Sequence, residues 1–146
     1  MITQNRWQHI LGVARKAKEF ALKMYPDNEK YAEDMFLLGL LHDIGYEFSE
    51  TGKGHSTLGG EILRRSGYKY WNEVANHGYS EISIMTDELF ILNCVDMTVD
   101  VDGQNCTFCE RLEDIGHRYG INSSAYQKAC LEIKRLQSDA RYSKLE

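Results

Sequence analysis

The chain has 146 residues, of which 42% are hydrophobic and 11% aromatic, a composition typical of a folded globular protein rather than a disordered one. Its length fits one domain of ordinary size with a substantial core. The formal net charge of -5 argues against a nucleic-acid partner, because binding a polyanionic backbone requires a cluster of positive charge.

The N-terminus has no apolar stretch long enough for a signal peptide, and the longest strongly apolar run, residues 35–41, is too short to span a bilayer. We therefore expect a cytoplasmic protein with no membrane partner. In that compartment the cysteines are expected to be reduced thiols. They are Cys94, Cys106, Cys109 and Cys130.

Helical periodicity runs along the chain without a convincing alternating strand pattern, so we predict an all-α fold: a single-domain bundle of about six to seven helices. The first helix is predicted at residues 5–24, where apolar residues recur every three or four positions. The second is predicted from residue 29 to 41 or 43. Its later half is apolar on all sides, which predicts the central helix of the bundle. Gly45 is interpreted as its stop signal, and residues 46–54 as a polar loop.

Capping signals and apolar positions predict the remaining helices. They are expected at residues 56–65, 71–76, 87–99, 107–120 and 124–138. Thr86 is expected to cap the helix that it precedes. Thr107 and Glu110 have the spacing of a capping box, and Ser124 and Gln127 have the same spacing, so each pair is expected to open a helix.

Residues of metal-ligand type lie in or beside these apolar helices. They are His9, His42, Asp43, His55, His77 and Asp96. The chain has only five histidines, and four of them belong to this set. Imidazole suits transition metals, and a carboxylate can bridge two cations because it has two oxygens. The set predicts a metal centre in a helical core, and such centres usually carry out hydrolysis or oxygen chemistry.

Each member also has a purely structural interpretation. His9 suits the edge of a packed helix, His55 a helix cap, and His77 a cation at a helix C-terminus. Asp96 is the hardest to explain in this way, because Val95 and Met97 flank it and a carboxylate in such surroundings is costly unless paired or metal-bound. A metal centre explains all of these positions together.

The order of the residues resembles the HD-domain superfamily of metal-dependent phosphohydrolases: a histidine on the first helix, a His-Asp pair ending the second, two later histidines and a distal aspartate. The matching stretches are RWQHILGVA around His9, LLGLLHDIGY around His42-Asp43, GHSTLGGEIL around His55, EVANHG around His77 and ILNCVDMTVD around Asp96. They define a metal-site core at residues 5–100. A helical pair at residues 107–140 would complete a single, stand-alone HD-like domain over residues 1–146.

The resemblance implies a ligand set. His9, His42, Asp43 and Asp96 would hold a first metal, while His55 and His77 would complete a second site that Asp43 bridges. Asp43 would then be the central catalytic residue. The implied cofactor is one or two divalent metal ions per chain, with iron, manganese, nickel, cobalt or zinc preferred over magnesium because of the histidines.

The implied activity is hydrolysis of a small phosphate ester by a metal-activated water, with a nucleotide or dinucleoside polyphosphate as the expected substrate. Two alternatives share the ligand set: an HD-type di-iron oxygenase, and a non-catalytic, metal-stabilised domain that binds a nucleotide. Many family members carry a lysine shortly after the His-Asp pair, and this chain has none there. Arg6, on the helix face of His9, and Lys53 are therefore the candidate phosphate contacts.

Other polar residues are interpreted more simply. His117 is expected at the surface, and Asp100 and Asp102 in a solvated loop, with acid chemistry at the site mouth as the alternative. The Cys106-x-x-Cys109 spacing is a weak signal, because a zinc ribbon needs a second ligand pair; a redox pair at a helix start is the other interpretation. The last two helices have charged faces and are candidates for a homodimer interface or a lid.

Overall fold

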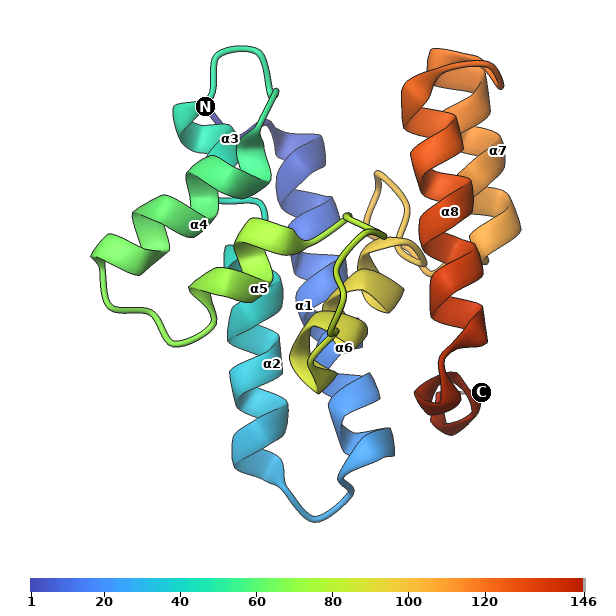
Figure 1. Ribbon diagram of the computed structural model, residues 1–146. Coiled ribbons are helices and arrows are strands. Elements are labelled where there is room, and N and C mark those ends of the chain that lie inside the picture. Colours follow the sequence, from blue (N-terminus) through green and yellow to red (C-terminus); the bar gives the residue numbers. More distant parts are fainter. Residues whose placement is uncertain (146) are drawn as a thin grey trace.

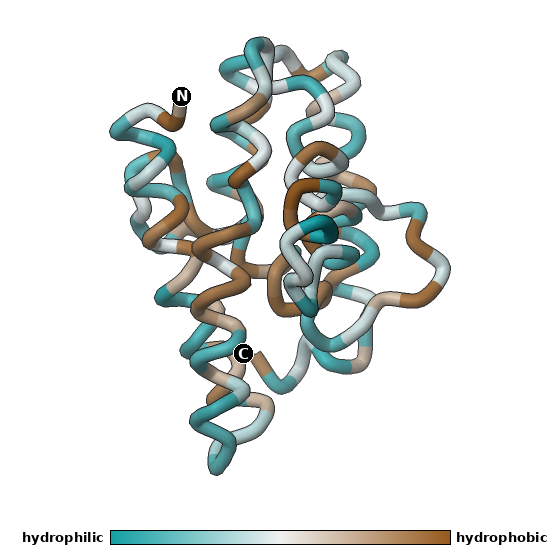
Figure 2. Tube along the Cα trace, turned by 90° about the vertical axis from the view of Figure 1, so that its left-hand side faces the viewer, coloured by the Kyte–Doolittle hydropathy of each residue, from teal (hydrophilic) through white to brown (hydrophobic). Residues whose placement is uncertain are grey.

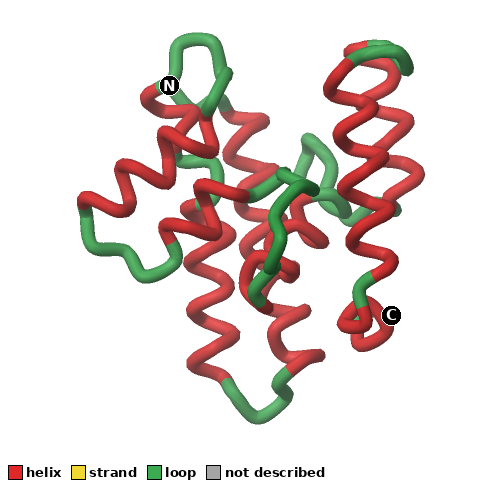
Figure 3. Tube along the Cα trace, in the orientation of Figure 1, coloured by secondary structure: helices red, strands yellow, loops and turns green. Residues whose placement is uncertain are grey.

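The structure, a computed structural model, describes residues 1–145 as helices joined by loops (Figures 1 and 3). The elements are α1 (Gln4–Met24), α2 (Glu29–Leu41), α3 (Gly45–Phe48), α4 (His55–Arg65), α5 (Trp71–Asn76), α6 (Asp87–Asp96), α7 (Phe108–Tyr119), α8 (Ser124–Ser138) and the 3-10 helix η1 (Ala140–Lys144). Within the described residues there is no strand, only an isolated bridge between Val99 and Asn105. The all-α prediction is confirmed. None of the helices in this range is long and apolar enough to cross a membrane.

α1 and α2 form an antiparallel hairpin, drawn from blue to cyan in Figure 1. The Thr3 side chain caps α1 by accepting a hydrogen bond from the Arg6 amide, and Asn28 caps α2 in the same way from Tyr31. The predicted apolar stripe of α1 is buried. Its members are Ile10, Val13, Ala14, Ala17, Ala21 and Met24. Figure 2 shows apolar and polar residues alternating along the helical tubes, as expected for helices with one buried face.

The central helix is α6, so the prediction that α2 occupies this place is wrong. Every residue of α6 from 89 to 95 is buried. In α2, by contrast, the Leu37 side chain is 44% exposed. Apolar composition did not distinguish the two helices, because a helix that packs on one neighbour can leave apolar side chains at the surface.

Gly45 does not stop a helix as predicted; α2 ends at Leu41, and Gly45 begins the short helix α3 inside the expected loop. A Cβ atom on Gly45 would lie 1.8 Å from the backbone oxygen of His55. The absence of a side chain therefore lets the start of α3 pack directly on the start of α4. This contact brings the turn after α2 next to His55.

α7 and α8 lie side by side as a helical pair, orange and red in Figure 1. The capping box that opens α7 is confirmed, with hydrogen bonds in both directions between Thr107 and Glu110. α8 is capped by Ser123 instead of Ser124, because the Ser123 hydroxyl accepts the hydrogen bond from the Tyr126 amide. α6 likewise ends at Asp96, earlier than the predicted 99.

Candidate metal centre

The predicted ligands are far apart in the sequence but come from neighbouring helix ends. His9 lies in α1, His42 and Asp43 in the turn after α2, His55 at the start of α4, His77 at the C-terminus of α5, and Asp96 at the end of α6. The structure brings all of them together around the two carboxylates. Local capping and turn formation fix the position of each side chain on its own element. Tertiary packing then brings these side chains into contact.

One group forms around Asp96. The Nε2 atom of His9 lies 2.9 Å from Oδ1 of Asp96. The Nε2 atom of His42 lies 3.4 Å from the same oxygen and 3.4 Å from Oδ2 of Asp43. The His42 side chain is completely buried, and the Asp96 side chain is 19% exposed.

A second group forms around the other oxygen of Asp43. The Nε2 atoms of His55 and His77 lie 3.4 and 3.5 Å from Oδ1 of Asp43. One Asp43 oxygen therefore faces His42 and the other faces His55 and His77. This is the arrangement that a carboxylate bridging two cations requires. His55 is the most exposed of these histidines, with 24% of its side chain accessible, so the second group is more open to solvent.

The other ring nitrogen of each histidine is fixed by a backbone carbonyl. Nδ1 of His9 lies 3.0 Å from the carbonyl oxygen of Asp100, and Nδ1 of His42 lies 2.7 Å from that of Gly39. Nδ1 of His55 lies 3.2 Å from the carbonyl oxygen of Gly52, and Nδ1 of His77 lies 2.6 Å from that of Val74. A carbonyl oxygen only accepts, so Nδ1 must carry the hydrogen, and a neutral ring then presents its lone pair at Nε2. Metal-binding histidines are commonly oriented in this way.

The donor set fits divalent metal ions. The Nε2 lone pairs and the carboxylate oxygens are all acceptors, so their close approach requires either a second proton on the rings or a cation among them. The buried Nε2 atom of His42 has no hydrogen-bond partner among residues 1–145. Two overlapping sets of potential ligands satisfy metal spacing, His9 with His42 and Asp96, and His42 with Asp43 and His77. Mixed nitrogen and oxygen donors suit transition metals.

The electrostatics of the centre also favour a cation. Burial would raise the pKa values of Asp43 and Asp96, but the facing histidines outweigh it and hold both pKa values well below the usual range. Burial would lower the pKa of His42, but the carboxylates of Asp43 and Asp96 raise it to about 9. Two ionised carboxylates in a buried centre favour a positive charge among them, and a bound metal ion would supply that charge in place of the proton.

Arg6 lies at the centre, as a phosphate contact would require. Its Nη1 atom is 3.2 Å from Oδ2 of Asp43, and its side chain is 33% exposed. The guanidinium carbon lies 3.8 Å from the centroid of the Tyr46 ring, which also stacks on His55 with 4.1 Å between ring centroids. Tyr46 was assigned only to a loop in the sequence, although its position three residues after Asp43 placed it near the ligands.

Lys53, the other predicted phosphate contact, lies exposed in the loop before α4. The hydrogen bonds recorded for it involve its backbone, with the carbonyl accepting from Ser49 and the amide donating to Thr51. Within residues 1–145, its ammonium group forms no ion pair with Asp43 or Asp96. Its role as a phosphate contact stays a prediction.

The remaining polar residues lie mostly as expected. The Asp100 carboxylate accepts hydrogen bonds from the amides of Asp102 and Gln104, so it stabilises its own turn, and only its carbonyl contacts a ligand, His9. His117 is exposed, as predicted. All four cysteines are free thiols, and burial raises the pKa of Cys106, which does not favour a reactive thiolate there.

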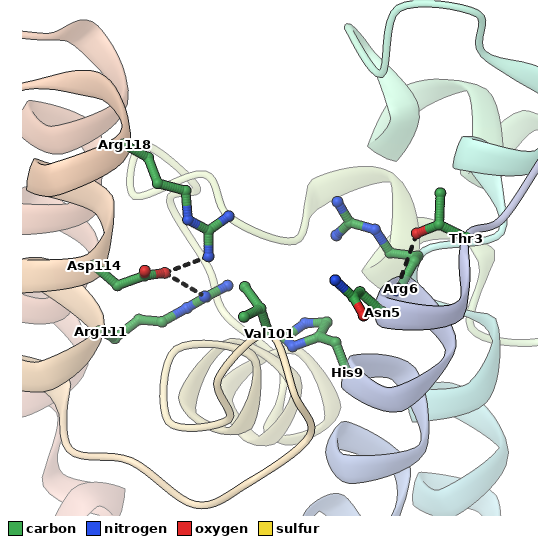
Figure 4. Close-up of a pocket in the computed structure, with 8 residues that line it drawn as sticks. All are labelled: Thr3, Asn5, Arg6, His9, Val101, Arg111, Asp114 and Arg118. Carbon is green, nitrogen blue, oxygen red and sulfur yellow. Dashed lines mark hydrogen bonds and ion pairs between the residues drawn. The ribbon is translucent and has the colours of Figure 1, made fainter.

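A cleft of about 290 Å³ opens beside His9, between the N-terminal turns of α1 and the helix α7 (Figure 4). Its lining residues are Thr3, Asn5, Arg6, His9, Val101, Arg111, Asp114 and Arg118. The arginines of α7 were not identified from the sequence. Their positions, 111 and 118 with Asp114 between them, follow a spacing of three and four that places them on one helix face, but nothing in that spacing shows what the face meets.

The HD domain family model matches residues 6–97, well over half of the chain and a range that contains every predicted ligand. The chain therefore belongs to the HD-domain family, as its motif order predicted. Members of this family are mostly metal-dependent hydrolases and bind divalent metals, in agreement with the donor set described above. No curated protein and no solved structure matches this chain.

Proposed function

We propose that this protein is a metal-dependent phosphohydrolase that acts on a small phosphate ester, a nucleotide or a dinucleoside polyphosphate. The observation that carries the proposal is the convergence of four histidine Nε2 atoms on the carboxylates of Asp43 and Asp96. Membership of the HD-domain family supports the same class of reaction. The adjoining cleft is about 290 Å³, which favours a substrate the size of a nucleotide over a dinucleoside polyphosphate.

Asp43 is the central residue of the proposed site, because its two oxygens face the two groups of histidines. It would bind both metal ions, while the carbonyl contacts at Nδ1 hold the histidine rings in place before a metal arrives. When bound, divalent metals at such a centre supply a nucleophilic water at neutral pH and positive charge beside the phosphoryl group.

Arg6 is the proposed phosphate contact in place of the lysine that many family members carry. It lines the cleft and also reaches Asp43, so it borders both the entrance and the ligands. A guanidinium group can donate two parallel hydrogen bonds to a phosphate. Lys53 remains a second candidate, from the exposed loop before α4.

The test is phosphate release from a panel of nucleotides and dinucleoside polyphosphates, measured separately with Mn²⁺, Fe²⁺, Co²⁺, Ni²⁺, Zn²⁺ and Mg²⁺. We expect metal-dependent release by the wild-type protein and background release by Asp43→Asn. Asp102→Asn is the matched control, because it removes an exposed carboxylate and should retain the wild-type rate.

Undiminished hydrolysis by Asp43→Asn would contradict the proposal. So would iron-dependent oxygen consumption without phosphate release, which would favour the oxygenase. Circular dichroism of each variant establishes that the helices are intact, so that a lost rate reports on the site.

A further inference from the structure

The wall of the cleft formed by α7 carries two arginines that have no role in the metal centre. Arg111 and Arg118 extend from α7 toward the cleft, opposite Arg6 and His9 of α1 (Figure 4). α7 also lies outside residues 6–97, the range matched by the family model. These arginines therefore lie outside the matched core that carries the ligands.

We propose that Arg111 and Arg118 form a second anion subsite, which binds the non-reacting phosphate of a substrate with two phosphate groups. Arg6 and the metal centre would take the reacting phosphate. The inference rests on the proposed function and narrows its substrate class to compact molecules with two phosphates.

The charge on this wall favours an anion. Asp114 is the carboxylate between the two arginines: Oδ2 of Asp114 lies 3.6 Å from Nη1 of Arg111 and also pairs with Nη2 of Arg118. One negative charge is thus shared by two guanidinium groups, which leaves the wall positively charged in a chain whose formal net charge is -5. The lining as a whole has three arginines and one carboxylate, and such an excess of positive charge attracts anionic ligands.

The arginines are also held ready for a ligand. Only 15% of the Arg111 side chain is exposed, and its Nε atom is buried without a hydrogen-bond partner in the part of the chain that the structure describes. The 3.6 Å separation from Asp114 is longer than a hydrogen bond, so this ion pair does not use the Nη1 donor fully. Arg118 is 40% exposed and accessible from the cleft. Restricting an arginine before binding lowers the entropy lost when a ligand binds.

The position and size of the cleft agree with this assignment. His9 belongs both to the predicted ligands and to the cleft lining, so the cleft adjoins the metal centre on the side of α1. Its volume of about 290 Å³ is at the lower end for ligand pockets, which suits a compact substrate. A molecule with one phosphate at the ligands can then direct its other phosphate to α7.

The test compares two probes that cannot be hydrolysed at a P–O bond between phosphates: methylenebisphosphonate, with two anionic groups, and methylphosphonate, with one. Binding is measured by calorimetry on the full-length, metal-loaded protein, with metal content checked after each titration. We expect the wild-type protein to bind the bisphosphonate at least about tenfold more tightly than methylphosphonate, because one charge-assisted hydrogen bond changes the dissociation constant by about this factor. Arg118→Ala should lose most of this preference by weakening bisphosphonate binding alone.

Arg65→Ala is the matched control, because Arg65 also pairs with a carboxylate four residues earlier, Glu61, but lies on α4 outside the cleft lining. It should keep the wild-type preference. Arg118→Lys should restore part of it by returning the charge without the two parallel donors. Arg111→Gln should resemble Arg118→Ala.

The subsite is wrong if the wild-type protein shows no preference, if Arg118→Ala retains it, or if Arg65→Ala loses it equally. Its failure is separable from that of the proposed function. If the protein shows metal-dependent hydrolysis and Arg118→Ala keeps the preference for the bisphosphonate, the subsite is contradicted and the proposed function is not. If the preference depends on Arg118 but the protein hydrolyses no phosphate ester, the proposed activity is contradicted and the subsite is not.

Discussion

At the residue scale, Tyr46 connects the two functional sides of the site. Its ring stacks on His55, a predicted ligand, and supports the guanidinium group of Arg6, the predicted phosphate contact. Loss of a partner that orients a metal ligand commonly lowers metal affinity or activity by about 10- to 100-fold. Tyr46 therefore belongs to the functional architecture, although it is not a ligand type in this set.

Replacing Tyr46 by alanine is expected to weaken metal binding about tenfold, because His55 and Arg6 both lose a neighbour that restricts their orientation. Tyr46→Phe keeps the ring and should remain close to wild type. Competition with a chromogenic chelator measures both affinities. Equal affinities in the two variants would show that the ring does not orient His55.

Sequence reasoning at this scale identified the histidines and aspartates that the structure brings together, but it did not identify the residues that support them. An aspartate in an apolar helix is conspicuous, because burial without a partner is costly, and this pointed to Asp96. Tyr46 and Arg111 carry no comparable signal, since tyrosine and arginine are ordinary on any surface. Only the folded chain shows which side chains they meet.

At the scale of elements, the loop after α6 fixes the orientation of His9. The Asp100 carbonyl in this loop lies 3.0 Å from Nδ1 of His9. Gly103 in the same loop has φ +82°, and a Cβ atom there would lie 2.3 Å from the Gln8 carbonyl oxygen. The loop can therefore approach α1 closely only with glycine at this position.

Gly103→Ala is expected to destabilise the fold by about 1–3 kcal/mol beyond the cost of the left-handed backbone, because the added methyl group meets α1. Gly67→Ala is the matched control: Gly67 has φ +79°, and nothing lies within 4 Å of the added Cβ. Urea unfolding measures both, and metal affinity should fall in Gly103→Ala alone. Similar losses of stability in the two variants would contradict the contact.

Glu132 in α8 is a second feature at this scale, a carboxyl group with 5% of the residue exposed and no partner for Oε1 within residues 1–145. Burial, with a smaller contribution from Asp96, outweighs the opposing effect of Arg111 and raises its pKa from the usual 4.5 to about 8. The folded state thus retains a proton that the unfolded chain loses. The contribution of Glu132 to stability must therefore fall as pH rises through the interval between these two values.

Glu132→Gln removes this ionisation, so the melting temperature of the variant relative to wild type should rise between pH 5 and pH 8. The two proteins are compared by calorimetry at equal metal concentration, which cancels effects of pH on metal binding. If the melting temperatures of the two proteins differ by the same amount at pH 5 and pH 8, the carboxyl group of Glu132 is not a buried group that stays protonated in the folded state.

Helix prediction succeeded where the signal was local. The capping box of α7 and the apolar stripe of α1 depend on residues within a few turns of each other, and both were correct. The place of α2 in the bundle and the role of Gly45 depend on which segments pack against them. Periodicity identifies an apolar face but does not identify the element that covers it, so these two assignments were wrong.

At the scale of the whole molecule, the fold places a predicted metal centre where the core meets the C-terminal helical pair. The core supplies the ligands, and α7 supplies the arginines that face Arg6 across the cleft. Arg6 and Arg111 are distant in sequence, so their proximity could be found only in the folded chain. The family match covers the core, and the substrate preference is proposed to come largely from the C-terminal helical pair outside it.

The most direct test of the central claim is the metal content of the protein purified without chelators and then loaded with Mn²⁺, Fe²⁺ or Zn²⁺, determined by elemental analysis. We predict about two metal ions per chain in the wild-type protein. His117→Gln, which changes an exposed histidine, should hold the same amount, and His42→Gln, which changes a completely buried one, should hold clearly less. A wild-type protein without metal, or a His42→Gln variant with undiminished content, would contradict the metal centre.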